Sequence, residues 1–157
     1  NSGVLTGEGG MGLLWYSAQA YEDFVLDLEF KCHSGNTNSG VFYRIPDVVT
    51  NNDYINKSFE IQINDSDVLT KHTMGAVYDA EPAKLHASNS TGDWNHYKIT
   101  VIKDEITVEL NGKEVNKWKM EPRGKIKEFS LKGYIGLQNH DSHAKISFRN
   151  IFLKELK

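Results

Sequence analysis

The 157-residue chain has little of several features that mark common protein classes. Its single cysteine, Cys32, excludes an intrachain disulfide and a multi-cysteine metal site, and in the run Phe30-Lys31-Cys32-His33 a buried thiol is favoured over a nucleophile. No apolar run approaches the roughly 20 residues of a membrane-spanning helix. The formal net charge is −3 with both signs well mixed, so the basic patch typical of nucleic-acid binding is missing. The chain begins at Asn1 without a signal-peptide pattern, and we expect it to be processed or trimmed.

The sequence also lacks a helix-period segment of useful length, which favours an all-β fold. Short runs alternate apolar and polar residues, and turn signals separate them. Asn111-Gly112 is the dipeptide of a tight hairpin, and a slip of one residue in the last run predicts a bulge at Arg149-Asn150. We expect an antiparallel sandwich or barrel, as one domain over residues 1–157. The expected strands are 13–16, 24–30, 41–45, 59–64, a short 74–78, 94–101, 105–110, 113–118, 133–138 and 145–155.

The run from Phe59 to Asn64 alternates most cleanly, with its apolar residues on one face and Glu60, Gln62 and Asn64 on the other. A carboxylate and two carboxamides would then stand about 7 Å apart along the strand. That spacing suits successive hydroxyl groups of a sugar. Taken alone, the motif is explained more simply by an ordinary outward strand face, and the rest of the chain favours the sugar.

A set of short motifs extends over nearly the whole chain, and the ordered set is far more specific than any one of them. In this order the motifs resemble the 3-keto-disaccharide hydrolase domain family. The resemblance implies a concanavalin-like jelly roll in a secreted or periplasmic bacterial protein that acts on glycosides. The family's usual glycine after the histidine is Asp141 here, which predicts a changed loop beyond His140. The motifs are Gly12-Leu13-Leu14-Trp15, Asp23-Phe24, Asn38-Ser39-Gly40-Val41-Phe42-Tyr43-Arg44, Glu60-Ile61-Gln62-Ile63, Gly75-Ala76-Val77-Tyr78, Trp94-Asn95-His96-Tyr97, Leu110-Asn111-Gly112, Gly136-Leu137-Gln138-Asn139-His140 and Phe148-Arg149-Asn150-Ile151.

The implied substrates determine the chemistry that the site needs. A ketone at C3 of a sugar acidifies the hydrogen at C2, so that a base can remove it, the C1 oxygen can leave by elimination, and water can add back. We assign His140 as the base because the ordinary pKa of histidine lies nearest neutrality, with Glu60 as the second catalytic candidate. The substrate-binding candidates are Arg44, Gln62, Gln138, Tyr78 and Trp15. We expect one concave side to hold Arg44, Glu60, Gln62, Gln138 and His140.

Simpler interpretations stay open for several of these residues. His140 could be a loop histidine that binds Asp141 or Ser142, and Arg44 could form a surface ion pair or stack on an aromatic ring. A divalent cation held by His140 and Glu60 is an open alternative, and no other cofactor is indicated. The second function class is a non-catalytic carbohydrate-binding module of a larger secreted protein, because the fold hosts both functions. The predicted partner is a carbohydrate, with no nucleic acid and no membrane span, and the oligomeric state is not predicted.

Overall fold

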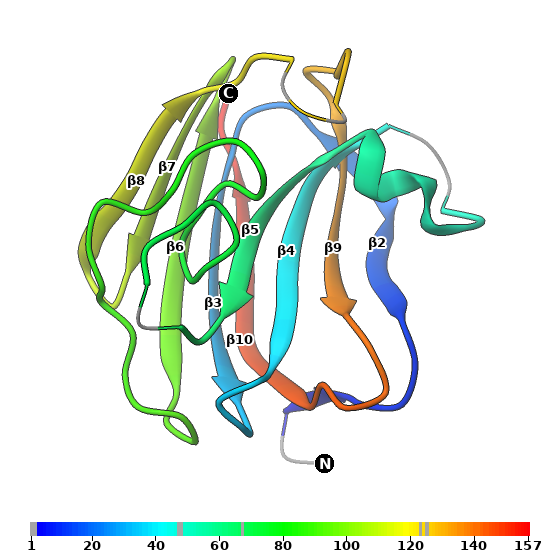
Figure 1. The fold of residues 1–157 in the computed structure, drawn as a ribbon. Helices are drawn as coiled ribbons and strands as arrows, with labels where there is room; N and C mark the ends of the chain where they lie inside the picture. Colours follow the sequence, from blue (N-terminus) through cyan, green and yellow to red (C-terminus); the bar gives the residue numbers. More distant parts are fainter. Residues whose placement is uncertain (1–2, 47–48, 67, 123, 125) are drawn as a thin grey trace.

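The computed structural model describes residues 3–46, 49–66, 68–122, 124 and 126–157. Its strands form two antiparallel sheets that pack face to face (Figure 1). This arrangement confirms the predicted all-β sandwich. In sheet order, the six-stranded sheet contains β1 (Leu5–Gly7), β10 (Ile146–Glu155), β3 (Phe24–Cys32), β6 (Asn95–Ile102), β7 (Glu105–Leu110) and β8 (Lys113–Lys119). The four-stranded sheet contains β2 (Gly12–Tyr21), β9 (Gly133–Asn139), β4 (Asn38–Ile45) and β5 (Phe59–Asn64).

Both local signals in the sequence are confirmed by the backbone. Asn111 and Gly112 have φ angles of 50° and 77° and join β7 to β8 in the tight turn that this dipeptide favours. The pairing of β10 with β3 shifts between Arg149 and Phe152, with Asn150 at a φ of 49°. Arg149 and Asn150 both donate to the Glu29 carboxylate, so the side chains secure the bulge.

Several segments differ from the prediction, and strand β2 continues to Tyr21, well beyond the expected end at residue 16. The short strand β1 was not predicted, and a 3-10 helix, η1 (Asn52–Asn56), occupies a stretch expected to be irregular. Segment 74–78 forms isolated bridges rather than a strand. Its backbone still follows the free edge of β5, because Gly75 N–H donates to the Gln62 carbonyl at 3.1 Å and Tyr78 N–H to the Glu60 carbonyl at 2.9 Å. The segment therefore covers a sheet edge that would otherwise be exposed.

The core lies between the two sheets and explains how β5 is oriented. Phe59, Ile61 and Ile63 are buried in this core, where each contributes roughly 1.5–3 kcal/mol of hydrophobic stabilisation. Because successive side chains alternate, Glu60 and Gln62 must then lie on the opposite, outer face of the four-stranded sheet. The sequence pattern of this one strand thus determines which face receives its polar groups. In the described residues, we find no helix that is long and apolar enough to cross a membrane.

Candidate functional site

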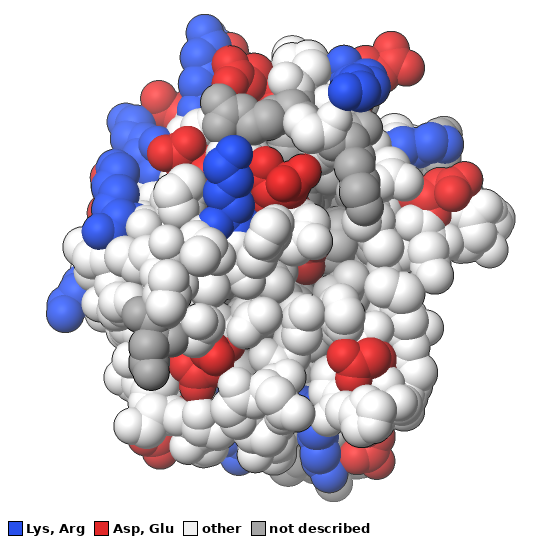
Figure 2. Space-filling model, in the orientation of Figure 1, with Lys and Arg blue, Asp and Glu red and all other residues white. Residues whose placement is uncertain are grey.

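A polar pocket of about 180 Å³ lies on the outer face of the four-stranded sheet. Strands β4, β5 and β9 supply its strand residues through their alternation, and connecting segments supply the others. Figure 2 shows that the middle of this side of the molecule is largely uncharged, with most Lys, Arg, Asp and Glu towards its margins. The pocket itself is lined mainly by uncharged polar and apolar side chains, which suit a neutral polar ligand. Its lining residues are Met11, Asn38, Ile55, Glu60, Gln62, Tyr78, Gln138 and His140.

Glu60 is the buried carboxyl group of this pocket. Its residue is only 6% exposed, and burial raises its pKa to about 8 because desolvation disfavours the charged form. No described residue forms a hydrogen bond with its carboxyl group. The side chain leans across Gly40 on the neighbouring strand β4, where a Cβ would overlap Oε1. Near neutral pH the group is therefore mainly a neutral carboxylic acid that can donate a proton.

Two buried carboxamides leave acceptor atoms unused. Gln62 Nε2 donates to Asn38 Oδ1 at 3.0 Å and to the His72 carbonyl at 3.3 Å. Its Oε1 is buried and has no hydrogen-bond partner among the described residues; Oε1 of Gln138 is likewise unpaired, with the Tyr54 hydroxyl near the same carboxamide. Leaving a buried acceptor unpaired costs about 1–3 kcal/mol, so these atoms indicate a ligand that donates hydrogen bonds. Hydroxyl groups of a sugar meet that requirement.

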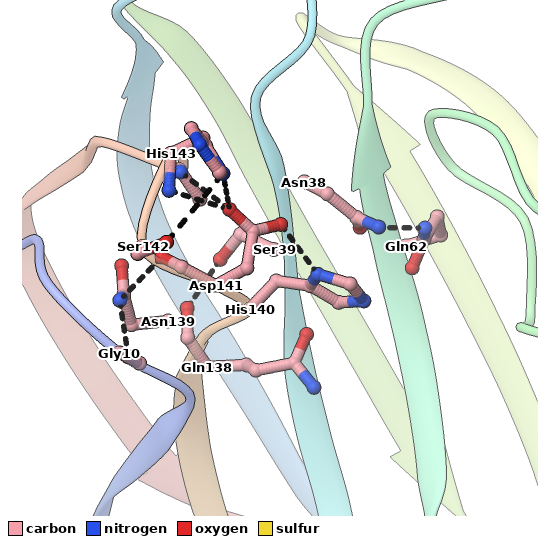
Figure 3. Close-up of polar contacts among 11 residues, drawn as sticks. Gly10, Asn38, Ser39, Gln62, Gln138, Asn139, His140, Asp141, Ser142 and His143 are labelled. Carbon is pink, nitrogen blue, oxygen red and sulfur yellow. Dashed lines mark hydrogen bonds and ion pairs between the residues drawn. The ribbon is translucent and has the colours of Figure 1, made fainter.

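His140 follows β9 and combines the two roles that the sequence left open. Its ring lines the pocket, and its Nδ1 lies 2.8 Å from Oδ2 of Asp141 (Figure 3). A carboxylate only accepts hydrogen bonds, so this contact requires a hydrogen on Nδ1. The ring and the Gln138 carboxamide point to the same side of the sheet (Figure 3). Ser142, the other expected partner, lies near His143 instead, at 3.5 Å.

Tyr78 is a lining residue of the same pocket. Its backbone is held beside Glu60 by the hydrogen bond described above, and its ring packs on His72 with 4.9 Å between centroids. Burial raises the pKa of the Tyr78 hydroxyl, with smaller contributions from Glu60 and Asp79. The hydroxyl therefore stays protonated near neutral pH and can donate a hydrogen bond.

Arg44 does not join this pocket, so the expected convergence is wrong for this residue. It has a φ of 61° at an irregularity where the pairing of β4 with β9 shifts between Phe42 and Ile45. Alternation fails at this point, and Ile45 packs with Phe42 on the outer side. The fully buried Arg44 side chain instead donates from Nη2 to the Lys103 carbonyl at 2.6 Å, in the turn between β6 and β7. Its observed contact is therefore structural.

Trp15 lies on β2 outside the pocket lining, with its ring edge-on to Tyr134 at 5.1 Å between centroids. A role of Trp15 in binding the substrate stays a prediction. Sequence reasoning missed Met11 and Ile55 as lining residues, because only the folded chain brings their segments to the pocket, and it missed Asn38 because the predicted strand began later, at Val41. The described residues contain no group of three or more His, Cys, Asp or Glu side chains arranged to hold a metal ion.

The sandwich is a jelly roll, a fold shared by glycoside-active enzymes and carbohydrate-binding modules. Residues 1–154 match the model of the 3-keto-alpha-glucoside-1,2-lyase-like domain, and the chain belongs to that family. A curated relative, 3-keto-disaccharide hydrolase of Bacteroides thetaiotaomicron, is 26% identical over 178 residues. That alignment covers 88% of this chain, and the chain spans about 60% of that protein's length.

Solved structures share the fold of this chain. A crystal structure of a proposed glycosyl hydrolase from Parabacteroides distasonis superposes with a TM-score of 0.85 at 31% identity, covering 99% of this chain and 88% of the other. The carbohydrate-binding module CBM66 from Bacillus subtilis gives a TM-score of 0.63 at 15% identity, covering 98% and 96% of the two chains. The second comparison concerns the fold alone.

Proposed function

We propose that the protein cleaves 3-keto-glycosides by removing the C2 proton, eliminating the C1 substituent and adding water. The observation that supports this most strongly is the shared pocket. A neutral carboxyl group on Glu60, a free ring nitrogen on His140 and two unpaired carboxamide oxygens line the same small space. Membership of the family supports the same class of reaction.

The first half of the proposed reaction is an elimination. His140 Nε2 takes the proton from C2, and the electron pair of that bond forms the enolate with the C3 ketone. The Tyr78 hydroxyl donates a hydrogen bond to the developing enolate oxygen. The Glu60 carboxyl group protonates the glycosidic oxygen as the C1–O bond breaks. The products of this half are the free alcohol and an unsaturated 3-keto sugar.

The second half reverses these proton positions. The Glu60 carboxylate takes a proton from water as the oxygen adds to C1, and protonated His140 returns a proton to C2. Both side chains recover their starting states, and the net reaction consumes one water molecule. One acid and one base thus serve both halves, as microscopic reversibility requires.

The size of the pocket indicates how a substrate would be held. A volume of about 180 Å³ is below the roughly 300–1,000 Å³ of typical ligand pockets. We therefore propose that one 3-keto sugar ring enters and that its C1 substituent stays outside. Oε1 of Gln62 and of Gln138 would accept hydrogen bonds from the ring hydroxyls.

The direct test is product analysis after mixing the protein with a 3-keto-glucoside and, separately, with the unoxidised glucoside. We expect release of the alcohol and the 3-keto sugar from the first substrate only, since the second has no acidified C2 hydrogen. Parallel reactions with EDTA and with added divalent cations test the alternative that Glu60 and His140 supply ligands to a metal. Cleavage of the parent glucoside at an equal rate would contradict the proposal.

A non-catalytic carbohydrate-binding module is the second candidate. The unpaired carboxamide oxygens favour it, because they would bind sugar hydroxyls whether or not chemistry follows. Binding of glycans without cleavage of any 3-keto substrate, with or without divalent cations, would establish this function. Under either function, we propose from the family resemblance that the protein is secreted or periplasmic. A single domain over residues 1–157 is likewise proposed.

A further inference from the structure

Asp141 uses both oxygens of its carboxyl group, and only one of them touches His140. Oδ2 lies 2.8 Å from His140 Nδ1, whereas Oδ1 accepts the backbone N–H groups of His143 at 2.7 Å and Ala144 at 2.8 Å (Figure 3). Two backbone bonds on one oxygen fix the plane of the carboxyl group. The other oxygen is thereby held in a constant place beside the imidazole.

We propose that Asp141 is a positioning residue that holds His140 in its Nδ1–H tautomer and keeps Nε2 directed to the pocket. The catalytic consequence rests on the proposed function, whereas the tautomer itself does not. An acceptor bound to one ring nitrogen determines which nitrogen carries the hydrogen. The same bond restricts rotation of the half-exposed ring, which has no other hydrogen bond to a described side chain.

The charge of Asp141 supports this role. Its hydrogen bond to His140 and those from the His143 and Ala144 backbones lower the pKa of Asp141 to about 2. The group is therefore an anion, and an acceptor only, throughout the neutral pH range. The nearby imidazole of His143 lies 3.7 Å from Oδ1, on the side away from His140, and is largely exposed. It therefore does not compete for Oδ2.

The loop that carries Asp141 is also fixed by contacts outside this carboxyl group. Asn139 Nδ2 donates to the Asp141 carbonyl at 3.2 Å and to the Gly10 carbonyl at 2.6 Å. These bonds connect the His140 loop to the segment before β2. That segment contains Met11, which lines the pocket. A change confined to Oδ2 should therefore alter the imidazole without releasing the loop.

The variant Asp141→Asn makes that change. Its remaining Oδ1 can keep both backbone bonds, while an NH₂ group replaces Oδ2 and can only donate to His140 Nδ1. Nδ1 must then accept, and the hydrogen moves to Nε2. The same geometry that directs Nε2 to the pocket would therefore present an N–H group to the substrate in place of a base.

The first test is nitrogen NMR of the folded protein labelled with ¹⁵N-histidine, at a pH where His140 is neutral. The His140→Ala spectrum identifies the His140 signals. We expect the Nδ1–H tautomer in the wild type and the Nε2–H tautomer in Asp141→Asn. An Nε2–H tautomer in the wild type, or the same tautomer in both proteins, would overturn the proposal. The wild-type measurement decides the matter even where the variant does not fold.

The second test is steady-state kinetics on a 3-keto-glucoside. We expect Asp141→Asn to lower kcat by about tenfold or more with little change in KM, since one proton acceptor is lost and no binding group. In the His140→Ala background the same substitution should cause no further loss, because Asp141 acts through His140. An additive loss in that background would contradict the role.

Asp65→Asn is the matched control, because Asp65 accepts the Thr91 hydroxyl at 2.6 Å in another loop and does not line the pocket. It should leave kcat unchanged. If the wild type cleaves no 3-keto substrate, the proposed function fails, and the NMR result still decides whether Asp141 sets the tautomer. The two proposals are therefore tested separately.

Discussion

The polar side chains on the outer faces of the two sheets differ in their burial and in their pairing. On the six-stranded sheet, charged groups are paired across neighbouring strands and remain in contact with solvent. His96 lies 2.8 Å from Asp27, and Lys98 lies 2.9 Å from Glu109. Such exposed pairs contribute between about 0 and 1 kcal/mol each, so this face is ordinary solvated surface.

The four-stranded sheet buries its outward polar groups and leaves acceptors unused. Gln62 is 2% exposed and Gln138 is 3% exposed, and Glu60 lies beside them with a pKa raised by burial. Each unpaired acceptor carries a cost of about 1–3 kcal/mol that better-packed apolar residues would avoid. A chain that keeps such groups in one place is typical of a functional site. Equivalent substitutions on the two faces should therefore have unequal effects.

The largest contrast is expected between the histidines of the two faces. His140→Ala should lower turnover of a 3-keto-glucoside by at least about a hundredfold, the lower end for loss of a general base. His96→Ala removes the pair with Asp27 on the other sheet and should leave turnover unchanged. Steady-state kinetics measures both, and circular dichroism checks the fold. Near-normal activity of His140→Ala would transfer the role of base to Glu60.

The next contrast concerns two glutamates, and its first part is activity. Glu60→Gln should lower turnover by about ten- to a hundredfold, since a carboxamide cannot protonate the leaving oxygen. In the wild type, turnover should fall as pH rises through about 8, where Glu60 loses its proton. Glu109→Gln, on the six-stranded sheet, should change neither quantity. A pH–rate profile that stays flat across this range would contradict the acid role.

The same pair predicts a difference in stability. The pKa of Glu60 is higher in the folded state than in the unfolded chain, so between about 4.5 and 8 the folded protein binds more protons. The contribution of Glu60 to stability is therefore full at low pH and is lost as pH rises to about 8. Glu60→Gln removes this loss. Denaturant unfolding should therefore show that the free energy of unfolding of the variant rises relative to that of the wild type between pH 5 and pH 8. Glu109→Gln should show no such trend.

A glycine comparison probes the position of the carboxyl group. Gly40→Ala places a methyl group where Glu60 Oε1 lies and should displace that side chain, lowering turnover by about tenfold. Gly12→Ala, at the start of β2, meets no atom within 4 Å and should be silent. Kinetics with both variants measures the effect. Equal activity of Gly40→Ala and the wild type would show that the exact place of Glu60 is unimportant.

The smallest expected effect is in binding. Gln62→Met should raise KM by about five- to tenfold with little change in kcat, because a carboxamide can accept sugar hydroxyls but cannot take the C2 proton. Thr107→Val makes a comparable polar-to-apolar change on β7 of the other sheet and should leave KM unchanged. A loss confined to kcat would instead assign Gln62 to the chemical step.

The sequence predicted the two sheets and three pocket residues on strands, because period-two alternation survives where strands are regular. Glu60, Gln62 and Gln138 belong to such stretches. Arg44 does not belong to a regular stretch, and the neighbouring residues do not predict the positive φ angle that this non-glycine residue adopts. A single irregularity there redirected the guanidinium to the other sheet.

The remaining features depend on contacts between distant segments. Met11 and Ile55 reach the pocket from a loop and from η1, and no local pattern encodes that meeting. Asp141 was visible as a departure from the family pattern, but the direction of each oxygen is set by the turn through His143 and Ala144. Sequence patterns therefore indicated the chemical groups, and only the fold shows how they are oriented.

The most direct test of the central claim is the isotope content of the product formed in deuterated water. If His140 removes the C2 proton and later returns one, the 3-keto sugar released from a 3-keto-glucoside should carry deuterium at C2, as read by mass spectrometry and proton NMR. A short reaction time and the His140→Ala protein control for spontaneous exchange next to the ketone. Product released by the wild type with hydrogen retained at C2 would contradict elimination and indicate direct hydrolysis.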